Sequence, residues 1–232
     1  MNFSKIIWRL IDHSKAILPG RWRLPLRYFT WIISRDVEPE LVYLFDLCNN
    51  FRCAIDIGAN HGFYSFKMLR RFEQVYAFEA NSSVDFDIAH YKKPNLHFFQ
   101  FGLSDENIKR QLNVPLQAGV AYDGWASVED RALSFADDFK RIPVSLQRLD
   151  DQPFTKEQLI DLIKIDVEGH ELEVLRGAQT TIKRHKPVLI IENNKNQKEI
   201  CKLLIPLGYR RSSFSEFSGK PLSSPNIIFI HI

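Results

Sequence analysis

Short apolar runs alternate with amphipathic segments over most of the chain, and this alternation is the main guide to its fold. Mostly apolar runs predict buried strands at 53–57, 75–78, 96–101, 162–167, 188–191 and 227–230. Apolar residues recur at helical spacing within 64–72, 170–185 and 197–207, and a more polar strand pair is predicted at 110–114 and 142–148. Such alternation predicts an α/β fold in which a mainly parallel sheet carries helices on both faces.

The first 37 residues depart from this pattern and are predicted to form a short basic helical segment before a domain of residues 38–232. Pro19-Gly20 divides this segment into two parts. Residues 1–35 hold seven Lys and Arg against Asp12 alone, a net charge of +6. The rest of the chain holds 24 basic and 27 acidic residues, so the basic character belongs to the N-terminal segment.

Two compatible interpretations of the N-terminal segment follow from its residues. Ile6, Ile7, Leu10 and Ile11 recur at helical spacing, and an amphipathic helix of this kind usually packs its stripe on its own protein. Basic residues interleaved with Trp can also hold a helix at an anionic membrane surface. We therefore expect a helical cap, a peripheral membrane contact through residues 1–35, or both.

Composition narrows the class of protein. With 232 residues, 45% hydrophobic and 25% charged, the chain is typical of a globular protein with one α/β domain. Its three cysteines form no CxxC pair, which argues against a disulfide framework or a thiolate zinc site. Neither a signal peptide nor an apolar run of about 18 residues is recognisable. We expect a cytoplasmic protein, with the inner face of the membrane as its peripheral site.

The first buried run ends in a glycine turn that is a candidate cofactor site. The sequence Asp-Ile-Gly-Ala-Asn-His-Gly over 56–62 lies between a predicted strand and a predicted helix, where backbone N–H groups can meet a ligand. Asn60 stands where a dinucleotide fingerprint needs its middle glycine. We expect Asp56, Gly58, Asn60 and Gly62 to bind a cofactor without a pyrophosphate; a purely structural turn is the alternative.

Two further positions suit the same cofactor. Glu79 ends the second predicted strand, 21 residues after Gly58, where a carboxylate can accept hydrogen bonds from both hydroxyls of a ribose. Ser104 and Asp105 follow the third predicted strand, where an adenine ring would lie. Asp105 is equally suited to opening a turn. For Glu79, the alternative is an ordinary surface residue at the end of a strand.

The densest cluster of ionisable residues is Lys-Ile-Asp-Val-Glu-Gly-His-Glu over 164–171. Strand alternation places Lys164 and Asp166 on one face, and buried charges are costly unless they pair or serve a ligand. Ligands in open α/β sheets bind at the carboxyl ends of strands, where Asp166 lies. His170 follows in the first helical turn, and Glu192 ends the next strand on the same rim. A purely structural ion network is the alternative.

These motifs together resemble one family, the FkbM-type methyltransferases. The resemblance covers roughly residues 50–195 and rests on Asp56–Gly62, Ala77–Asn81, Gly102–Asp105, Ile163–Glu171, Leu175–Gly177 and Pro187–Glu192, which occur in the family's order. It implies a class I methyltransferase fold with a seven-stranded sheet and S-adenosylmethionine as the methyl donor. It also implies O-methylation of a hydroxyl on a sugar, glycan, polyketide or similar acceptor.

Candidate catalytic residues follow from that resemblance and from the ionisable cluster. Asp166 or His170 can take the hydroxyl proton, with Lys164 beside them. Alternatively, Asp166 and Glu192 can hold a divalent cation that orients and acidifies the hydroxyl. Aromatic residues in the loop 118–125 can stack on a sugar ring, although an ordinary surface loop fits them as well.

Other classes of protein fit less well. An NAD-dependent nucleotide-sugar oxidoreductase or epimerase is the second enzyme hypothesis, but the middle glycine and a Tyr-x-x-x-Lys pair are missing. A non-catalytic module that binds a cofactor or a membrane is the third. Nucleic acid is not expected as a partner, because the basic residues form an N-terminal segment instead of lining the strand ends.

Overall fold

The computed structural model describes residues 18–34, 37–219 and 224–232. Its main feature is a seven-stranded sheet in the order β10-β11-β9-β8-β1-β2-β3. The strands are β1 (Cys53–Ile57), β2 (Gln74–Phe78), β3 (Leu96–Phe99), β8 (Ile160–Ile165), β9 (Val188–Glu192), β10 (Tyr209–Ser212) and β11 (Asn226–His231). The five strands β9, β8, β1, β2 and β3 are parallel, whereas β11 is antiparallel to both β9 and β10. The carboxyl ends of β1, β2, β8 and β9 therefore meet at one edge.

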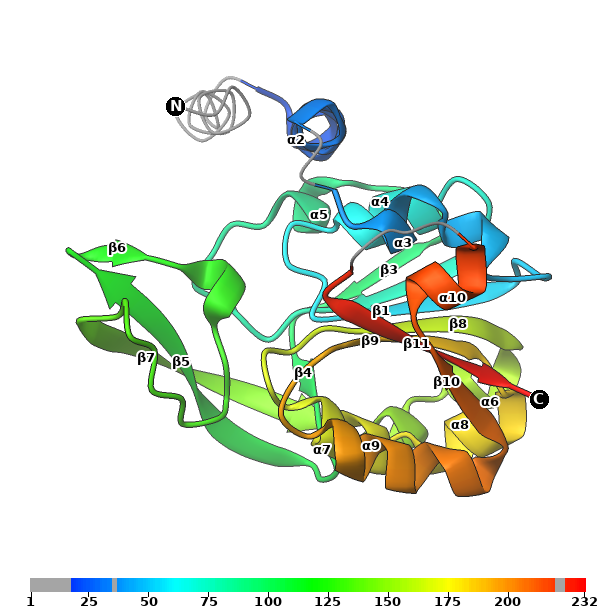
Figure 1. Cartoon of the computed structure of the whole chain (residues 1–232). Coiled ribbons are helices and arrows are strands. Elements are labelled where there is room, and N and C mark those ends of the chain that lie inside the picture. The colour runs from blue at the N-terminus through cyan, green and yellow to red at the C-terminus, as the bar shows by residue number, and fades with distance from the viewer. Residues whose placement is uncertain (1–17, 35–36, 220–223) are drawn as a thin grey trace.

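Helices cover both faces of this sheet, as the sequence predicted (Figure 1). One face carries α3 (Pro39–Val42), α4 (Phe63–Met68), α5 (Asp87–His90) and α10 (Phe214–Ser218). The other carries α6 (Phe154–Glu157), α7 (Glu171–Arg176), α8 (Gln179–His185) and α9 (Gln197–Leu204). Alternate strand residues feed the two hydrophobic cores: Ile55 and Ile163 face one, and Ala54 and Leu162 face the other.

A second, four-stranded sheet in the order β4-β7-β5-β6 projects from the main sheet (Figure 1). Its strands are β4 (Gly102–Leu103), β5 (Ile108–Gln117), β6 (Val120–Ala121) and β7 (Asp138–Gln147). The predicted polar strand pair is its centre, since β5 and β7 pair antiparallel over their whole length. It has a small core of its own, which includes Leu112, Val114 and Val144.

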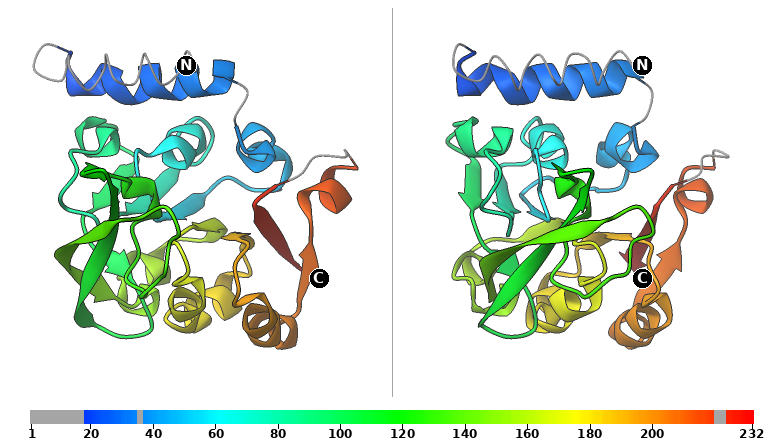
Figure 2. Two further views of the ribbon diagram at one scale, coloured as in Figure 1. Left: turned by 60° about the vertical axis from the view of Figure 1, so that its left-hand side comes forward. Right: turned by 90° about the vertical axis from the view of Figure 1, so that its left-hand side faces the viewer.

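Helix α2 (Gly20–Ser34) forms an outer layer over α4 and α5 (Figure 2). It begins directly after Pro19, where the sequence predicted a break. The predicted stripe of Ile6, Ile7, Leu10 and Ile11 lies outside the described residues. Among the described helices, none is long and apolar enough to cross a membrane.

The structure corrects the predicted elements in three places. The single helix predicted over 170–185 is two helices, α7 and α8, separated at Gly177, where a Cβ would lie 1.9 Å from the carbonyl oxygen of Ser104. The apolar run 96–101 ends its strand at Phe99, and the chain then enters the second sheet. The hairpin partner β10 and helix α10 were not predicted, because their short sequences carry no clear period.

Candidate active site

The glycine turn after β1 lies against the end of β8. Gly58 has a φ of +79°, and a Cβ there would lie 1.8 Å from the carbonyl oxygen of Asp166. Only glycine suits this position, because other residues are strained at positive φ and would also clash with the backbone. The N–H groups of Gly58 and Ala59 donate to the carbonyl of Phe78 at 2.9 Å each, which ties the turn to β2. The predicted turn is thus fixed against two neighbouring strands.

Glu79 links this turn to the end of β2. Its two carboxylate oxygens accept the N–H groups of Asn60 and Asn81, each at 2.8 Å. Burial raises the pKa of Glu79 to about 7 even though these N–H groups act in the opposite direction. Each oxygen keeps a lone pair, so the carboxylate can accept hydrogen bonds from ribose hydroxyls while it still accepts the two backbone N–H groups.

Asp56, which was predicted to bind the cofactor, makes a structural contact with the start of the next helix. Its Oδ2 accepts the backbone N–H of Ser65 at 2.9 Å and the Ser65 hydroxyl at 2.5 Å. Burial raises its pKa to about 6. Gly62, with a φ of +92°, leaves no room for a Cβ beside Ile88. Gly62 therefore sets the turn geometry, and Asp56 fixes the start of α4.

A buried polar network holds Asp166 at the end of β8. The Lys164 ammonium, only 1% exposed, donates to Asp166 Oδ2 at 3.0 Å and to Asn226 Oδ1 at 2.9 Å. Asn226 and the Tyr64 hydroxyl both donate to Glu38 Oε2, at 2.8 and 2.5 Å. Burial alone lowers the pKa of Lys164, but the charges of Asp166 and Glu38 outweigh it and raise that pKa. Lys164 is therefore a permanent cation that positions Asp166.

A first cavity of about 320 Å³ opens at the carboxyl ends of the parallel strands. Glu79, Asn60 and Asp166 line its polar side. Its apolar wall comes from both sheets and comprises Ile57, Phe78, Leu103, Leu112, Val128 and Leu146. A cavity with an apolar wall and a few convergent polar groups is typical of a small-molecule site.

A second cavity of about 410 Å³ adjoins the first. The two cavities share the lining residues Glu38, Gly58, Asn60, Asp123, Gly124 and Asp166. Only the second is lined by Trp31 of α2 and by Phe63, whose rings stack with centroids 4.7 Å apart. Asp166 and the glycine turn thus stand between two neighbouring cavities.

The loop 118–125 reaches this region differently from the prediction. Its Asp123 and Gly124 line both cavities, whereas Tyr122 and Trp125 do not. Those two rings instead contact Phe135, with centroid distances of 5.3 and 5.4 Å. The aromatic wall is therefore supplied by Trp31 and Phe63, residues that the sequence gave no reason to combine.

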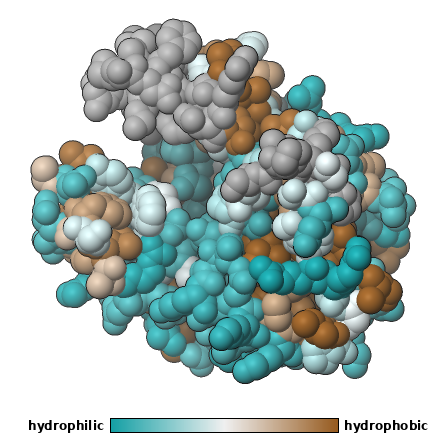
Figure 3. All heavy atoms as spheres, in the orientation of Figure 1, coloured by the Kyte–Doolittle hydropathy of each residue, from teal (hydrophilic) through white to brown (hydrophobic). Residues whose placement is uncertain are grey.

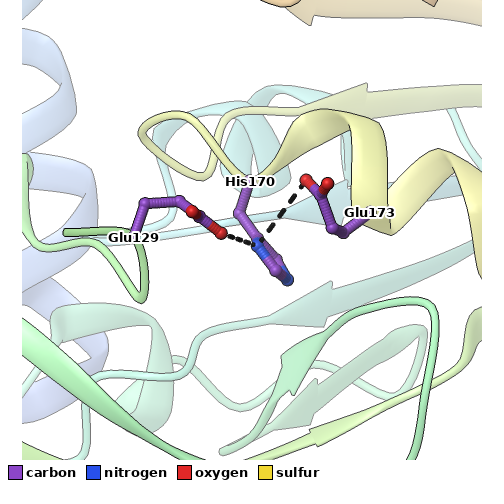
Figure 4. A group of neighbouring side chains, drawn as sticks. All are labelled: Glu129, His170 and Glu173. Atoms are coloured by element: carbon purple, nitrogen blue, oxygen red, sulfur yellow. Dashed lines mark hydrogen bonds and ion pairs between the residues drawn. The ribbon is translucent and has the colours of Figure 1, made fainter. Parts of the chain in front are cut away.

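His170 lines the first cavity, and both of its ring nitrogens are engaged. Figure 4 shows the contacts of Nδ1 with Glu129 and Glu173. Nδ1 lies 2.7 Å from Glu129 Oε1, and Nε2 lies 2.9 Å from the Ser104 hydroxyl. The side chain is 5% exposed. Ser104 is thus committed to His170, and neither Ser104 nor Asp105 lines the cavity. Leu103 and Gly102 line it where the two polar residues were expected, because β4 turns the chain into the second sheet.

Carboxylates gather on the rim beside Asp166. Oxygens of Asp166, Glu168 and Glu192 lie within 4.8 Å of one another, and Glu168 was not predicted. Burial, followed by the charges of Asp166 and Glu168, raises the pKa of Glu192. Glu171 belongs to the scaffold, since its Oε1 accepts the N–H groups of Val167 and Gly169 at 3.0 and 3.1 Å.

The site also contains residues that sequence reasoning missed. Glu38 precedes α3 and Asn226 begins β11, 188 positions apart in the chain, yet they contact each other beside Lys164. No motif surrounds either residue. Only the unfavourable burial of Lys164 indicated that further polar partners must lie nearby.

The fold and the site together define a class I methyltransferase fold: a seven-stranded mixed sheet with a glycine turn after β1, an acid at the end of β2 and a cavity at the strand ends. The family model for the methyltransferase FkbM domain matches residues 56–217, more than half of the chain. The chain belongs to the FkbM methyltransferase family. No curated protein matches it.

Several solved structures are similar to this chain. The chain is similar to the methyltransferase FkbM from Methylobacillus flagellatus KT, with a TM-score of 0.52 and 18% identity; the match covers 78% of this chain and 44% of that protein. A TehB-like SAM-dependent methyltransferase from Corynebacterium glutamicum ATCC 13032 Kitasato matches over 95% and 99% of the two chains, at 13% identity and a TM-score of 0.43. TrmK from M. capricolum, solved with S-adenosyl-homocysteine, matches over 84% and 67%, at 13% identity and a TM-score of 0.42.

Proposed function

We propose that this protein is an S-adenosylmethionine-dependent O-methyltransferase that acts on a hydroxyl of a sugar or glycan. The observation that carries the proposal is the pair of cavities that meet at Asp166 and the glycine turn. Methyl transfer needs two ligands side by side with the reacting atoms in line, and two adjoining cavities suit that requirement. The family match supports the reaction class.

The first cavity suits the donor. Glu79 can accept hydrogen bonds from the ribose hydroxyls, while the apolar wall around Leu103 and Leu146 suits an adenine ring. Backbone approach at Gly58 suits the methionine portion. This assignment leaves the methyl group near Asp166, at the boundary with the second cavity.

The second cavity suits a sugar acceptor. Aromatic rings such as Trp31 and Phe63 can pack on the apolar face of a sugar ring, and the carboxylates of Glu38 and Asp166 can accept hydrogen bonds from its hydroxyls. In the proposed reaction the bond between sulfur and the methyl carbon breaks as the bond from the acceptor oxygen to that carbon forms. Asp166 takes the hydroxyl proton, and Lys164 holds the Asp166 carboxylate in place.

A divalent cation remains a prediction. The oxygens of Asp166, Glu168 and Glu192 are of the type that Mg²⁺ prefers, so the residues fit such an ion. Lys164 already neutralises Asp166, and Arg131 pairs with Glu168 at 2.8 Å, which weakens the need for a metal. If bound, the ion would orient and acidify the acceptor hydroxyl.

Transfer of a labelled methyl group tests the proposed function. Purified protein is incubated with isotopically methyl-labelled S-adenosylmethionine and extracted cell glycans, with and without EDTA, and products are identified by mass spectrometry. We expect labelled O-methyl sugar to form in the presence of EDTA as well as in its absence. If EDTA abolishes product formation and Mg²⁺ restores it, a metal ion is assigned to Asp166, Glu168 and Glu192. Calorimetric binding of NAD without binding of S-adenosylhomocysteine would support the oxidoreductase alternative and refute the proposal.

Donor affinity should depend on pH through Glu79. Only ionised Glu79 accepts from both ribose hydroxyls, and its pKa is about 7 before binding. The affinity for S-adenosylhomocysteine should therefore rise about tenfold between pH 6 and pH 8, as the ionised fraction grows. The free protein should show the opposite trend: a raised pKa stabilises the fold at low pH, and this contribution is lost as the pH rises through 7. Calorimetry with Glu79→Gln as the control should give weaker, pH-independent binding.

A further inference from the structure

Helix α2 carries apolar side chains on its outward face as well as on the face that packs on the protein. Its inward face holds Leu24, Tyr28, Arg23 and Arg27, all of them buried. On its outward face, Trp22, Leu26, Phe29 and Ile33 are 53%, 42%, 51% and 68% exposed. These four residues follow the spacing i, i+4, i+7 and i+11, so they form one stripe along the helix. Hydrophobic side chains gather on α2 at the top of the molecule (Figure 3). We call this set the outer stripe.

Ion pairs and apolar packing together fix which face of α2 lies inward. Arg27 Nε lies 2.6 Å from Asp87 Oδ2, with both side chains almost fully buried, and Arg23 Nη1 lies 3.0 Å from Asp85 Oδ2. On the same inward side, the ring of Tyr28 packs on Phe66 with centroids 4.8 Å apart. The helix cannot turn its outer stripe inward without breaking these contacts.

The net charge of the N-terminal segment indicates which kind of surface the outer stripe binds. Of the seven basic residues in 1–35, Arg23 and Arg27 are committed to ion pairs, whereas Arg21 is exposed; the other four lie outside the described residues. Even without the two paired residues, this segment holds five cations against Asp12. An exposed apolar stripe in a segment with excess positive charge suits a lipid bilayer, whose surface can be negatively charged and whose interior is apolar.

We propose that α2 binds an anionic lipid bilayer through the outer stripe, with Trp22 and Ile33 inserted at the level of the headgroups. The helix lies along the surface of the protein, so it can rest flat on a membrane without unfolding (Figure 2). Its inward side contributes Trp31 to the second cavity. If the proposed function holds, the membrane-bound enzyme would present that cavity beside the bilayer, which suits a lipid-anchored acceptor.

Vesicle flotation of the full chain tests the membrane proposal without any acceptor or donor. We expect flotation with phosphatidylglycerol-containing vesicles, little with pure phosphatidylcholine, and weaker binding at high salt. The variant Trp22→Ser/Ile33→Ser should reduce binding by about tenfold or more, because both side chains lose apolar contact with lipid. The matched control Leu159→Ser/Ile205→Ser removes side chains that are 56% exposed, beside α6 and α9 on the opposite side, and should float like wild type.

A charge variant keeps the test decisive if the serine variant folds poorly. Arg21→Glu should weaken flotation, whereas Arg210→Glu, also exposed but on β10, should not. Flotation that is absent, or that the α2 variants leave unchanged, overturns the proposal. The proposal is also overturned if light scattering shows a dimer that Trp22→Ser/Ile33→Ser dissociates and the protein does not bind vesicles. The outer stripe would then be the interface between two copies of the chain. Methyl transfer in solution is unaffected by any of these outcomes, so the proposed function stands or falls separately.

Discussion

Replacing Asp166 by Asn should lower the rate of methyl transfer by about 10²–10⁴-fold, the usual contribution of a positioned general base. Asp166 lines both cavities, and Lys164 fixes it from a buried position. Asn keeps the size and the hydrogen bond from Lys164 but cannot take a proton at neutral pH. Donor affinity should stay close to that of wild type, because Glu79 and the glycine turn are unchanged. Initial rates on the acceptor found by the labelling experiment, together with calorimetry for S-adenosylhomocysteine, provide the measurement.

His170→Gln is the matched comparison for Asp166→Asn. His170 has both ring nitrogens engaged, by Glu129 and Ser104, so it is less free to take a proton than the sequence suggested. We expect a smaller loss of turnover than for Asp166→Asn. A loss as large as that of Asp166→Asn, in a variant that still binds the donor, would make His170 the base and Asp166 its support.

Replacing Arg27 by Ala should produce the largest loss of stability among the α2 variants. Asp87 is fully buried, and its contact with His61 and the charge of Arg27 lower its pKa in spite of burial. Without Arg27 a buried carboxylate loses its main partner, which typically costs about 3–5 kcal/mol. For a chain of this length the melting temperature should fall by about 6–20 °C. Differential scanning calorimetry at neutral pH provides the measurement.

Arg23→Ala is the control for Arg27→Ala. Its partner Asp85 has a side chain that is 50% exposed, so this pair should contribute only about 0–1 kcal/mol. Equal destabilisation by the two variants would contradict the view that burial of the Arg27–Asp87 pair fixes α2. The difference in stability between the two variants also matters for the outer stripe, because the buried Arg27–Asp87 pair helps to hold that face of α2 inward and the outer stripe outward.

The prediction for α2 shows where sequence reasoning reached its limit. Arg23 and Arg27 were counted among the cations available to a membrane, since Lys and Arg are rarely buried. The carboxylates that bury them, Asp85 and Asp87, lie about 60 positions later in the chain. No local pattern reveals such a partner, so the direction in which α2 faces depends on long-range contacts, these charge pairs among them.

The sequence by itself determined the α/β class, the parallel strands and the place of the glycine turn. Apolar runs identify buried strands, and Gly58 reflects a local backbone geometry that other residues cannot adopt. Because the carboxyl ends of parallel strands share one edge, Glu79 and Asp166 could be placed near each other before the fold was known. These features depend on local propensity and on a general rule of sheet topology.

Only the tertiary structure decided which remote residues complete the site. Glu38, Trp31 and Asn226 come from segments at the two ends of the chain, and they reach Asp166 because α2, α3 and β11 pack around the parallel strands. Likewise Ser104 makes a hydrogen bond with His170 and does not itself line the cavity. A side-chain contact between residues more than a hundred positions apart depends on how whole helices and strands pack. The pattern of neighbouring residues along the chain does not predict that packing.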